Sequence, residues 1–271
     1  MVEPRGALAQ KNHWNDIAKQ WNRWTSPLRP CREDVEAIRQ FLEPGDGLCL
    51  LLGVTPEFTG LSNRLVAIDN DAAMIGSLWP GNQAGRNVVR GDWLDMPFIA
   101  SCFDSIIGDG SLTLLSYPLQ YERVFDQLSR LLKPGGKILI RLFASPELEE
   151  TCAEVCEEAL RGRIAGFHAF KWRLAMAVAA ESHKPNVGVV DIHAAFNRLL
   201  PDRNRLATAT GWSHEDIATI DLYRGSPARY SYPTLAQLRQ VFARRFKETG
   251  LRQGTYELAE RCPILILESR E

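Results

Sequence analysis

Five short apolar segments, each ending at or just before a polar or glycine residue, constrain the fold of this chain most strongly. They are residues 48–53, 65–69, 88–92, 103–110 and 132–140. The stretches between the early segments suit helices, and apolar runs separated by helices are typical of parallel strands that are covered on both faces. The sequence therefore predicts an α/β fold with a doubly wound, mostly parallel sheet.

Polar residues and glycine stand at the carboxyl ends of these strands. Gly53 ends the first strand, and Asp69 and Asp92 end the next two. Loops that leave this edge of an open α/β sheet diverge and form the crevice in which ligands bind. Two carboxylates in this position suit the hydroxyl and amino groups of an adenosine. The sequence therefore indicates a site for a nucleoside cofactor.

These segments together resemble the class I S-adenosylmethionine-dependent methyltransferase family over residues 35–145, with a weaker similarity at the C-terminus. The resemblance implies a Rossmann-like sheet of seven strands and S-adenosyl-L-methionine as the cofactor. It implies that Asp69 binds the ribose, that Asp92 faces the adenine amino group, and that Met74 and Trp93 pack on the adenine. The full set of implied cofactor residues is Gly53, Thr55, Asp69, Asn70, Met74, Asp92, Trp93, Asp109 and Gly110.

The loop after the first strand departs from the family's glycine-rich pattern, because Thr55 and Glu57 stand where further glycines would be expected. Glycines there allow positive φ and close backbone approach, so we expect a different loop shape or a substitute contact from the Thr55 hydroxyl. The departure keeps open a second function, a non-catalytic protein that binds S-adenosylmethionine or S-adenosylhomocysteine. A nicotinamide-dependent oxidoreductase is disfavoured, because Gly-x-Gly-x-x-Gly does not follow the first strand.

Composition and charge narrow the partners and the location. The formal net charge is −1 over 271 residues, so no nucleic-acid partner is expected, and no apolar run predicts a membrane span. The six cysteines are scattered and are expected to be reduced, which favours the cytoplasm. No metal site is expected, since nothing nearby completes a ligand set around Cys152 and Cys156. The sequence indicates no oligomeric state.

Four segments are expected along the chain. Residues 1–42 form a helical segment in which Trp14 and Trp21 share a face, either as packing or as a lid over the site. Residues 43–145 form the cofactor-binding α/β core, and residues 146–248 form a mostly helical elaboration that binds substrate. Residues 249–271 complete the sheet, with an antiparallel hairpin built from residues 252–258 and 263–267.

Methyl transfer requires alignment of an acceptor with the methyl group and exclusion of water, and a general base only where the acceptor must lose a proton. Asp109 is a candidate catalytic residue, or a helix cap or cofactor contact. Arg141 is a candidate for binding an anionic acceptor, or a member of a structural ion pair. His168 and Lys171 are expected on a solvated basic helix face. The candidate substrate-binding residues for a small-molecule acceptor are Trp14, Trp21, Arg141, Trp172, Tyr223, Tyr230 and Tyr232.

Overall fold

The computed structural model describes residues 13–42 and 47–270, and within them seven strands form the main sheet. The order across the sheet is β3-β2-β1-β4-β5-β9-β8, with β1 to β5 parallel and β9 antiparallel to both of its neighbours. The doubly wound, mostly parallel sheet is confirmed. Its strands are β1 (Cys49–Leu52), β2 (Leu65–Asp69), β3 (Arg86–Arg90), β4 (Phe103–Asp109), β5 (Leu132–Arg141), β8 (Phe246–Arg252) and β9 (Ile264–Ser269).

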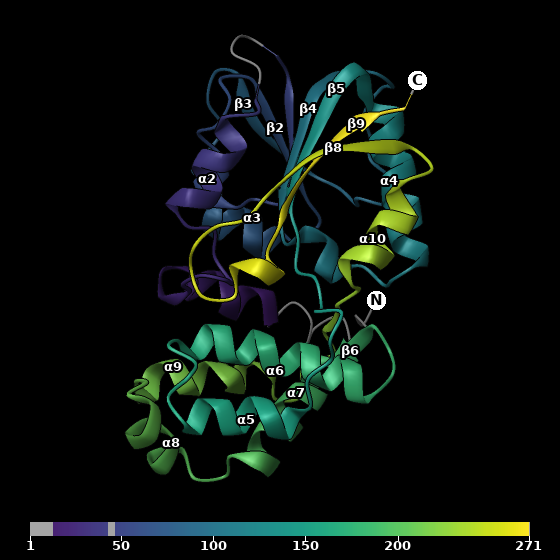
Figure 1. Cartoon of the computed structure of the whole chain (residues 1–271). Helices are drawn as coiled ribbons and strands as arrows, with labels where there is room; N and C mark the ends of the chain where they lie inside the picture. The colour runs from purple at the N-terminus through teal and green to yellow at the C-terminus, as the bar shows by residue number, and fades with distance from the viewer. Residues whose placement is uncertain (1–12, 43–46, 271) are drawn as a thin grey trace, which may run out of the picture.

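Helices cover both faces of this sheet (Figure 1). All four residues of β1 are buried, with Cys49 and Leu51 packed in one layer and Leu50 and Leu52 in the other. Burial on both faces explains why the strand is apolar throughout. Four helices form the two layers: α2 (Arg32–Arg39) and α3 (Ala72–Leu78) on one side, α4 (Leu119–Leu131) and α10 (Leu235–Phe242) on the other.

The strand order reverses beside β1. The chain runs from β1 outward to β2 and β3 and then returns to the opposite side of β1 at β4. Connections on the two sides of such a reversal leave in opposite directions, which opens a crevice at the carboxyl ends of β1 and β4.

The C-terminal strands differ in part from their predicted positions. β8 ends at Arg252, whereas a strand was expected over residues 252–258, and this expectation is wrong. Residues 253–258 instead lead to η5 (Ala259–Arg261). β8 is an edge strand with a register shift between Glu248 and Gly250, so its sequence lacks a regular apolar alternation. The antiparallel pairing of the last two strands is confirmed.

A second, mostly helical layer lies below the sheet in Figure 1. Its helices bury a common apolar cluster that includes Phe170, Phe196 and Trp212. Two short strands also pair within it, a feature that the sequence did not indicate. The elements of this layer are α5 (Cys152–Leu160), α6 (Phe167–Glu181), β6 (Asn186–Gly188), α7 (Val189–Leu199), α8 (Arg203–Thr210), α9 (His214–Ala218), η4 (Thr219–Tyr223) and β7 (Arg229–Ser231).

Helix α6 is buried on nearly all sides. His168 is 4% exposed and Lys171 is 0% exposed, so the expected solvated basic face is wrong. The reason is tertiary packing, because Trp24 of the N-terminal segment covers both side chains.

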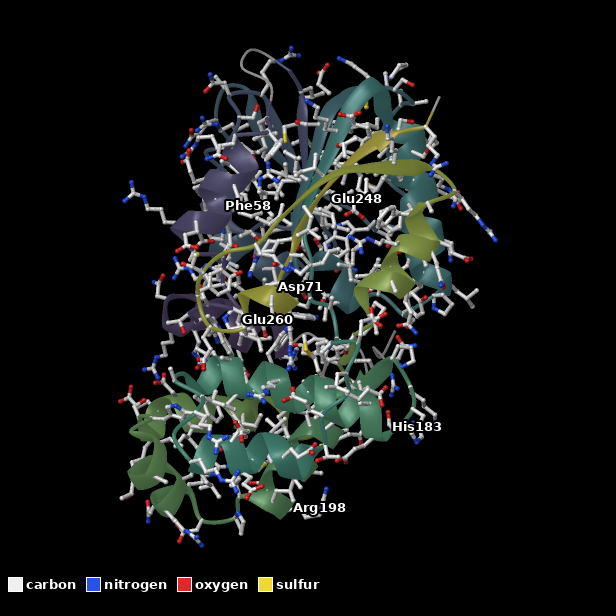
Figure 2. The ribbon with its side chains drawn as sticks, in the orientation of Figure 1. Phe58, Asp71, His183, Arg198, Glu248 and Glu260 are labelled. Atoms are coloured by element: carbon white, nitrogen blue, oxygen red, sulfur yellow. The ribbon has the colours of Figure 1, made fainter. Side chains whose placement is uncertain are left out.

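The N-terminal segment lies between the sheet and the helical layer (Figure 1). Residues 13–19 are helical and η1 (Trp21–Arg23) follows, while residues 1–12 of the predicted segment lie outside the described residues. Figure 2 shows side chains filling the space between the layers, with Asp71 toward the helical layer and Arg198 on that layer's outer side. Within the described ranges, every helix is too short or too polar to span a bilayer.

Candidate active site

A cavity opens where the carboxyl ends of β1, β2 and β4 meet the N-terminal segment and the helical layer. It contains about 850 Å³ of empty space, counting its opening to solvent. The structure brings together here most of the residues that the sequence assigned to cofactor and substrate. Those that line the cavity are Trp14, Trp21, Gly53, Thr55, Asp69, Met74, Trp93, Asp109, Gly110, Trp172, Tyr223 and Tyr230.

Gly53 begins the loop after β1 and has a φ of +94°. This conformation is costly for any residue with a Cβ, so the glycine is required for the backbone to turn here. Its amide donates to the Ile68 carbonyl at 2.8 Å, which ties the start of the loop to β2. Gly53 therefore has the positive φ expected of the first glycine in a glycine-rich loop, although the residues that follow it differ from that pattern.

The rest of this loop is shaped by Glu57. Residues after Thr55 form η2 (Pro56–Phe58) rather than an open glycine loop. The Trp21 indole Nε1–H donates to Glu57 Oε1 at 3.4 Å, and the Arg29 guanidinium pairs with the same oxygen. The residue that breaks the family pattern thus attaches the N-terminal segment to the sheet. Thr55 is buried and lines the cavity.

Asp69 ends β2 as a nearly buried carboxylate, with 8% of the residue exposed. Its Oδ1 accepts the Asp71 amide at 2.8 Å, and its Oδ2 lies 3.9 Å from the position of a Cβ added to Gly53. Burial raises the pKa of Asp69 to about 6, and backbone hydrogen bonds oppose that rise. The Asp69 carboxylate therefore lies beside the loop after β1 without full solvation. Hydroxyl groups of a ligand would supply the missing hydrogen bonds.

A second hollow adjoins the cavity and extends it along the ends of β2 and β3. The two share Trp14, Asp69, Met74, Trp93 and Leu114 among their lining residues. The second hollow adds the two remaining cofactor candidates, Asn70 and Asp92.

The Trp93 ring is held in place beside these residues. Its Nε1–H donates to the Ile68 carbonyl at 2.8 Å, while the Asp92 Oδ1 accepts the Leu94 amide at 2.9 Å. The carboxylates of Asp69 and Asp92 therefore border one continuous space with a fixed indole wall.

Asp109 and Gly110 close the cavity below β4. Gly110 has a φ of +62°, and a Cβ on it would stand 2.4 Å from Phe143 Cε2, so only glycine fits. Asp109 has a side chain that is 4% exposed. Burial raises the pKa of Asp109, and Arg141 opposes that shift. η3 (Ser111–Leu114) continues the wall.

Arg141 does not line the cavity, and its expected role as an anion-binding or catalytic group does not fit its position. Its side chain is 0% exposed, and its Nε donates to Asp109 Oδ1 at 2.5 Å. Its Nη1 donates to the Pro27 carbonyl at 2.9 Å and to the Tyr256 hydroxyl at 3.1 Å. Asp34 of α2 lies 3.8 Å away. The alternative, a structural ion pair, describes these contacts, since a buried guanidinium must be paired.

The aromatic substrate candidates separate into two groups. Trp14, Trp21, Trp172, Tyr223 and Tyr230 line the cavity. Tyr232 does not: it is 2% exposed and packs against Trp172, with ring centroids 5.5 Å apart, on the side of a different hollow. Tyr230 and Tyr232 are two positions apart, but β7 (Arg229–Ser231) ends before Tyr232. Strand alternation therefore does not place both tyrosine side chains on one face.

Two aromatic residues of the cavity were not among the predicted site residues. Phe143 follows β5 by two positions and Trp24 follows η1, and both line the cavity. The position of Phe143 just past a carboxyl strand end was a usable signal. Trp24 had no such signal, since its place depends on how the N-terminal segment packs on α6. Among residues 13–42 and 47–270, no group of three or more His, Cys, Asp and Glu could hold a metal ion.

Comparison with protein families places a methyltransferase domain over residues 43–140. A protein of Encephalitozoon cuniculi that is named as a methyltransferase is 36% identical over 61 residues, which are 22% of this chain and 29% of that relative. The match therefore spans less than a third of the relative's length.

Solved structures share the fold. The N-methyltransferase NodS of Bradyrhizobium japonicum, solved with S-adenosyl-L-homocysteine, has a TM-score of 0.51 at 13% identity, covering 96% of this chain and 100% of NodS. A Rhodobacter sphaeroides protein named as a zinc-dependent alcohol dehydrogenase has a TM-score of 0.60 at 11% identity, covering 100% of both chains. Identities this low establish the fold alone, so the chemistry must be argued from the site.

Proposed function

We propose that this chain binds S-adenosylmethionine and methylates a small molecule, since residues 43–140 match a methyltransferase domain and the strand ends resemble those of the class I S-adenosylmethionine-dependent family. The acceptor lies between the carboxyl edge of the sheet and the helical layer. The observation that carries this proposal is the cavity itself, which joins the Gly53 and Asp69 strand ends to the aromatic side chains of the helical layer.

The chain's residues fit the cofactor in two adjoining spaces. Asp69, buried and short of solvation, accepts the ribose hydroxyls. Met74 and Trp93 hold the adenine between them, and Asp92 lies in the adjoining hollow for its amino group. Gly53 allows the backbone to approach the methionine end. The raised pKa of Asp69 supports this assignment, because hydrogen-bond donors on a ligand would supply the solvation that burial removes.

When bound, the cofactor supplies an electrophilic methyl group, so the chain has to align an acceptor and keep water away from it. The N-terminal segment contributes Trp14, Trp21 and Trp24 to the cavity wall and is attached to the sheet through Glu57. This segment therefore acts as the cover of the site. Its attachment to the loop after β1 couples the cover to the place where the cofactor binds.

Two alternatives differ from this proposal in measurable ways. The non-catalytic protein is supported by Thr55 and Glu57, which replace glycines, but aromatic side chains of the helical layer line the cavity beyond the strand ends, where an acceptor would be contacted. An oxidoreductase would bind a nicotinamide dinucleotide instead.

We also infer a cytoplasmic location, because all six cysteines are free thiols.

Transfer of labelled methyl groups tests the proposal. The protein is incubated with methyl-tritiated S-adenosylmethionine and a small-molecule extract, and label in the extract is counted after removal of cofactor and protein. We expect transfer by the native protein, reduced at least about ten-fold in Asp69→Ala. Asp126→Asn, which changes a half-exposed acid on α4, serves as the matched control. Cofactor binding without any transfer would favour the non-catalytic protein.

A further inference from the structure

Two features of the cavity bear on the acceptor that it takes. The first is its charge: Asp69 and Asp109 are the only charged residues that line it in the described part of the chain. Among residues 13–42 and 47–270, no lysine, arginine or histidine lines this cavity; Arg229 lines only the adjoining hollow, and the Arg141 guanidinium is paired with Asp109. An anionic acceptor would therefore lose its hydration and meet no cationic side chain of the described residues in this cavity, so its only compensation there would be the positive sulfonium of the cofactor.

The second feature is an aromatic wall. Trp172 contacts Phe143 edge-to-face at 4.8 Å between centroids, and Tyr230 packs on Trp172 at 5.5 Å. Tyr223 packs edge-to-face on Tyr230 at 6.0 Å. Rings arranged in this way around an apolar space accept a flat apolar molecule, since offset and edge-on contacts add to the area buried.

One polar group of this wall, the Tyr230 hydroxyl, has its proton directed by His13. His13 Nδ1 lies 3.3 Å from the Leu222 carbonyl, which can only accept, so Nδ1 carries the proton. Burial lowers the pKa of His13, which favours the neutral ring. Its Nε2 is then an acceptor, and the Tyr230 hydroxyl, 3.2 Å away, donates to it.

The Tyr230 oxygen consequently turns its proton toward His13 and keeps lone pairs for other partners. Tyr223 donates one hydrogen bond to this oxygen, since the bond raises the pKa of Tyr223 and lowers that of Tyr230, and one lone pair of the Tyr230 oxygen remains. Burial raises the pKa of both phenols, so both stay protonated. The other charged groups that act on His13 are Lys171 of α6 and Asp16 of its own helix, which work in opposite directions. A molecule in the cavity would thus find an acceptor oxygen in an apolar wall.

We propose that the cavity selects an uncharged aromatic acceptor bearing an O–H or N–H group, which donates to a Tyr230 oxygen that His13 orients. This inference rests on the proposed function, since it names the acceptor class of the same site. His13 touches the acceptor only through Tyr230 and is a positioning residue.

Three probes that share a naphthalene ring separate the contributions of charge and of the hydrogen-bond donor to binding. 2-Naphthol is uncharged and carries a donor, 2-methoxynaphthalene lacks the donor, and 2-naphthoate is an anion at neutral pH. Each is titrated calorimetrically into the full-length protein with and without S-adenosylhomocysteine. We expect 2-naphthol to bind about five- to ten-fold tighter than 2-methoxynaphthalene, the value of one hydrogen bond. We expect it to bind at least about ten-fold tighter than 2-naphthoate.

Variants test the roles of the two residues. Tyr230→Phe should bring the ratio between 2-naphthol and 2-methoxynaphthalene close to one. His13→Leu should also lower this ratio, because the freed Tyr230 proton can then point into the cavity and donate to the ether. A merely structural role for His13 would weaken all probes equally and leave the ratio unchanged. Tyr232→Phe is the matched control: it removes the same atom outside the cavity and should keep the native ratio.

The outcomes distinguish the two proposals. If S-adenosylhomocysteine fails to bind, the proposed function is wrong, and the titrations without it still measure the selectivity of the cavity. If it binds but 2-naphthoate matches 2-naphthol, or Tyr230→Phe keeps the native ratio, the acceptor class is wrong. Failure of 2-naphthol to bind at all would also overturn it.

Discussion

The buried carboxylate of Asp69 destabilises the folded protein and is proposed to bind the cofactor. Variants of this one residue measure both effects. Its burial raises the pKa to about 6 in the folded protein, whereas the unfolded chain has a carboxyl pKa of about 4. The folded state therefore holds the proton more tightly. The charged form destabilises the fold fully above about pH 6, and that cost disappears as the pH falls to about 4.

Asp69→Asn should therefore stabilise the ligand-free protein while it weakens cofactor binding. We expect a gain of about 1–3 kcal/mol in the free energy of unfolding at pH 7.5, shrinking toward zero between pH 6 and pH 4. Urea denaturation across this pH range measures it. An Asp69→Asn protein that is less stable than the native one at pH 7.5 would contradict the proposed cost.

Arg141 illustrates the opposite case, a charge that the fold requires. Arg141→Met should lower the free energy of unfolding by about 3–5 kcal/mol, because it leaves Asp109 and Asp34 buried near each other without a cation. The double variant Arg141→Met with Asp109→Asn should recover part of this loss. Equal stability of the native protein and Arg141→Met in urea would instead favour a role outside the ion pair.

These residues show what the sequence could and could not predict about the site. The positions of Asp69 and Asp92 were predictable, because Asp69 ends β2, Asp92 lies two residues past the end of β3, and parallel strands end at a common edge. The pairing of Arg141 was not, because Asp34 lies more than a hundred residues away and no local pattern connects the two. The buried state of Lys171 was missed for the same reason, since Trp24 covers it from another element.

At the level of elements, the N-terminal segment is held by individual side-chain contacts with the sheet and the helical layer. Glu57 accepts from Trp21 and pairs with Arg29, so it connects this segment to the loop after β1. Glu57→Gln should weaken the attachment, and amide hydrogen exchange in residues 14–29 should become several-fold faster. Glu36→Gln breaks a solvent-exposed pair with Arg39 on α2 and should leave that exchange unchanged.

Acceleration confined to the neighbourhood of Glu57 itself, with residues 14–29 unaffected, would show that contacts other than those of Glu57 hold the cover. In that case Trp24 and its contact with Lys171, 4.0 Å from the ring centroid, would be the principal attachment.

Strand prediction also succeeded or failed element by element. The central strands each contain an apolar run, from all four residues of β1 to Ile106 and Ile107 within β4, and the sequence located each strand. The edge strand β8 begins at Phe246 and carries charged residues and a bulge, so the more regular stretch that follows it was mistaken for the strand. Edge strands carry weak patterns, because only part of their surface is buried.

Across the whole molecule, the site depends on two layers that are built separately and meet at one edge. The sheet supplies Gly53, Asp69 and Asp109, and the helical layer supplies Trp172 and Tyr230. The sequence predicted the sheet's contribution from strand ends. It named Trp172, Tyr223 and Tyr230 of the helical layer as candidate substrate contacts, but it could not separate them from Tyr232, since which side chains face the sheet depends on tertiary packing.

Calorimetric titration of the purified protein with S-adenosylmethionine and S-adenosylhomocysteine, with NAD as the control, tests the central claim most directly. We predict binding of the first two in the micromolar range, no binding of NAD, and a loss of about 1–3 kcal/mol of binding free energy in Asp69→Ala. Binding of NAD in preference to the sulfur-containing ligands, or binding that Asp69→Ala leaves unchanged, would contradict it.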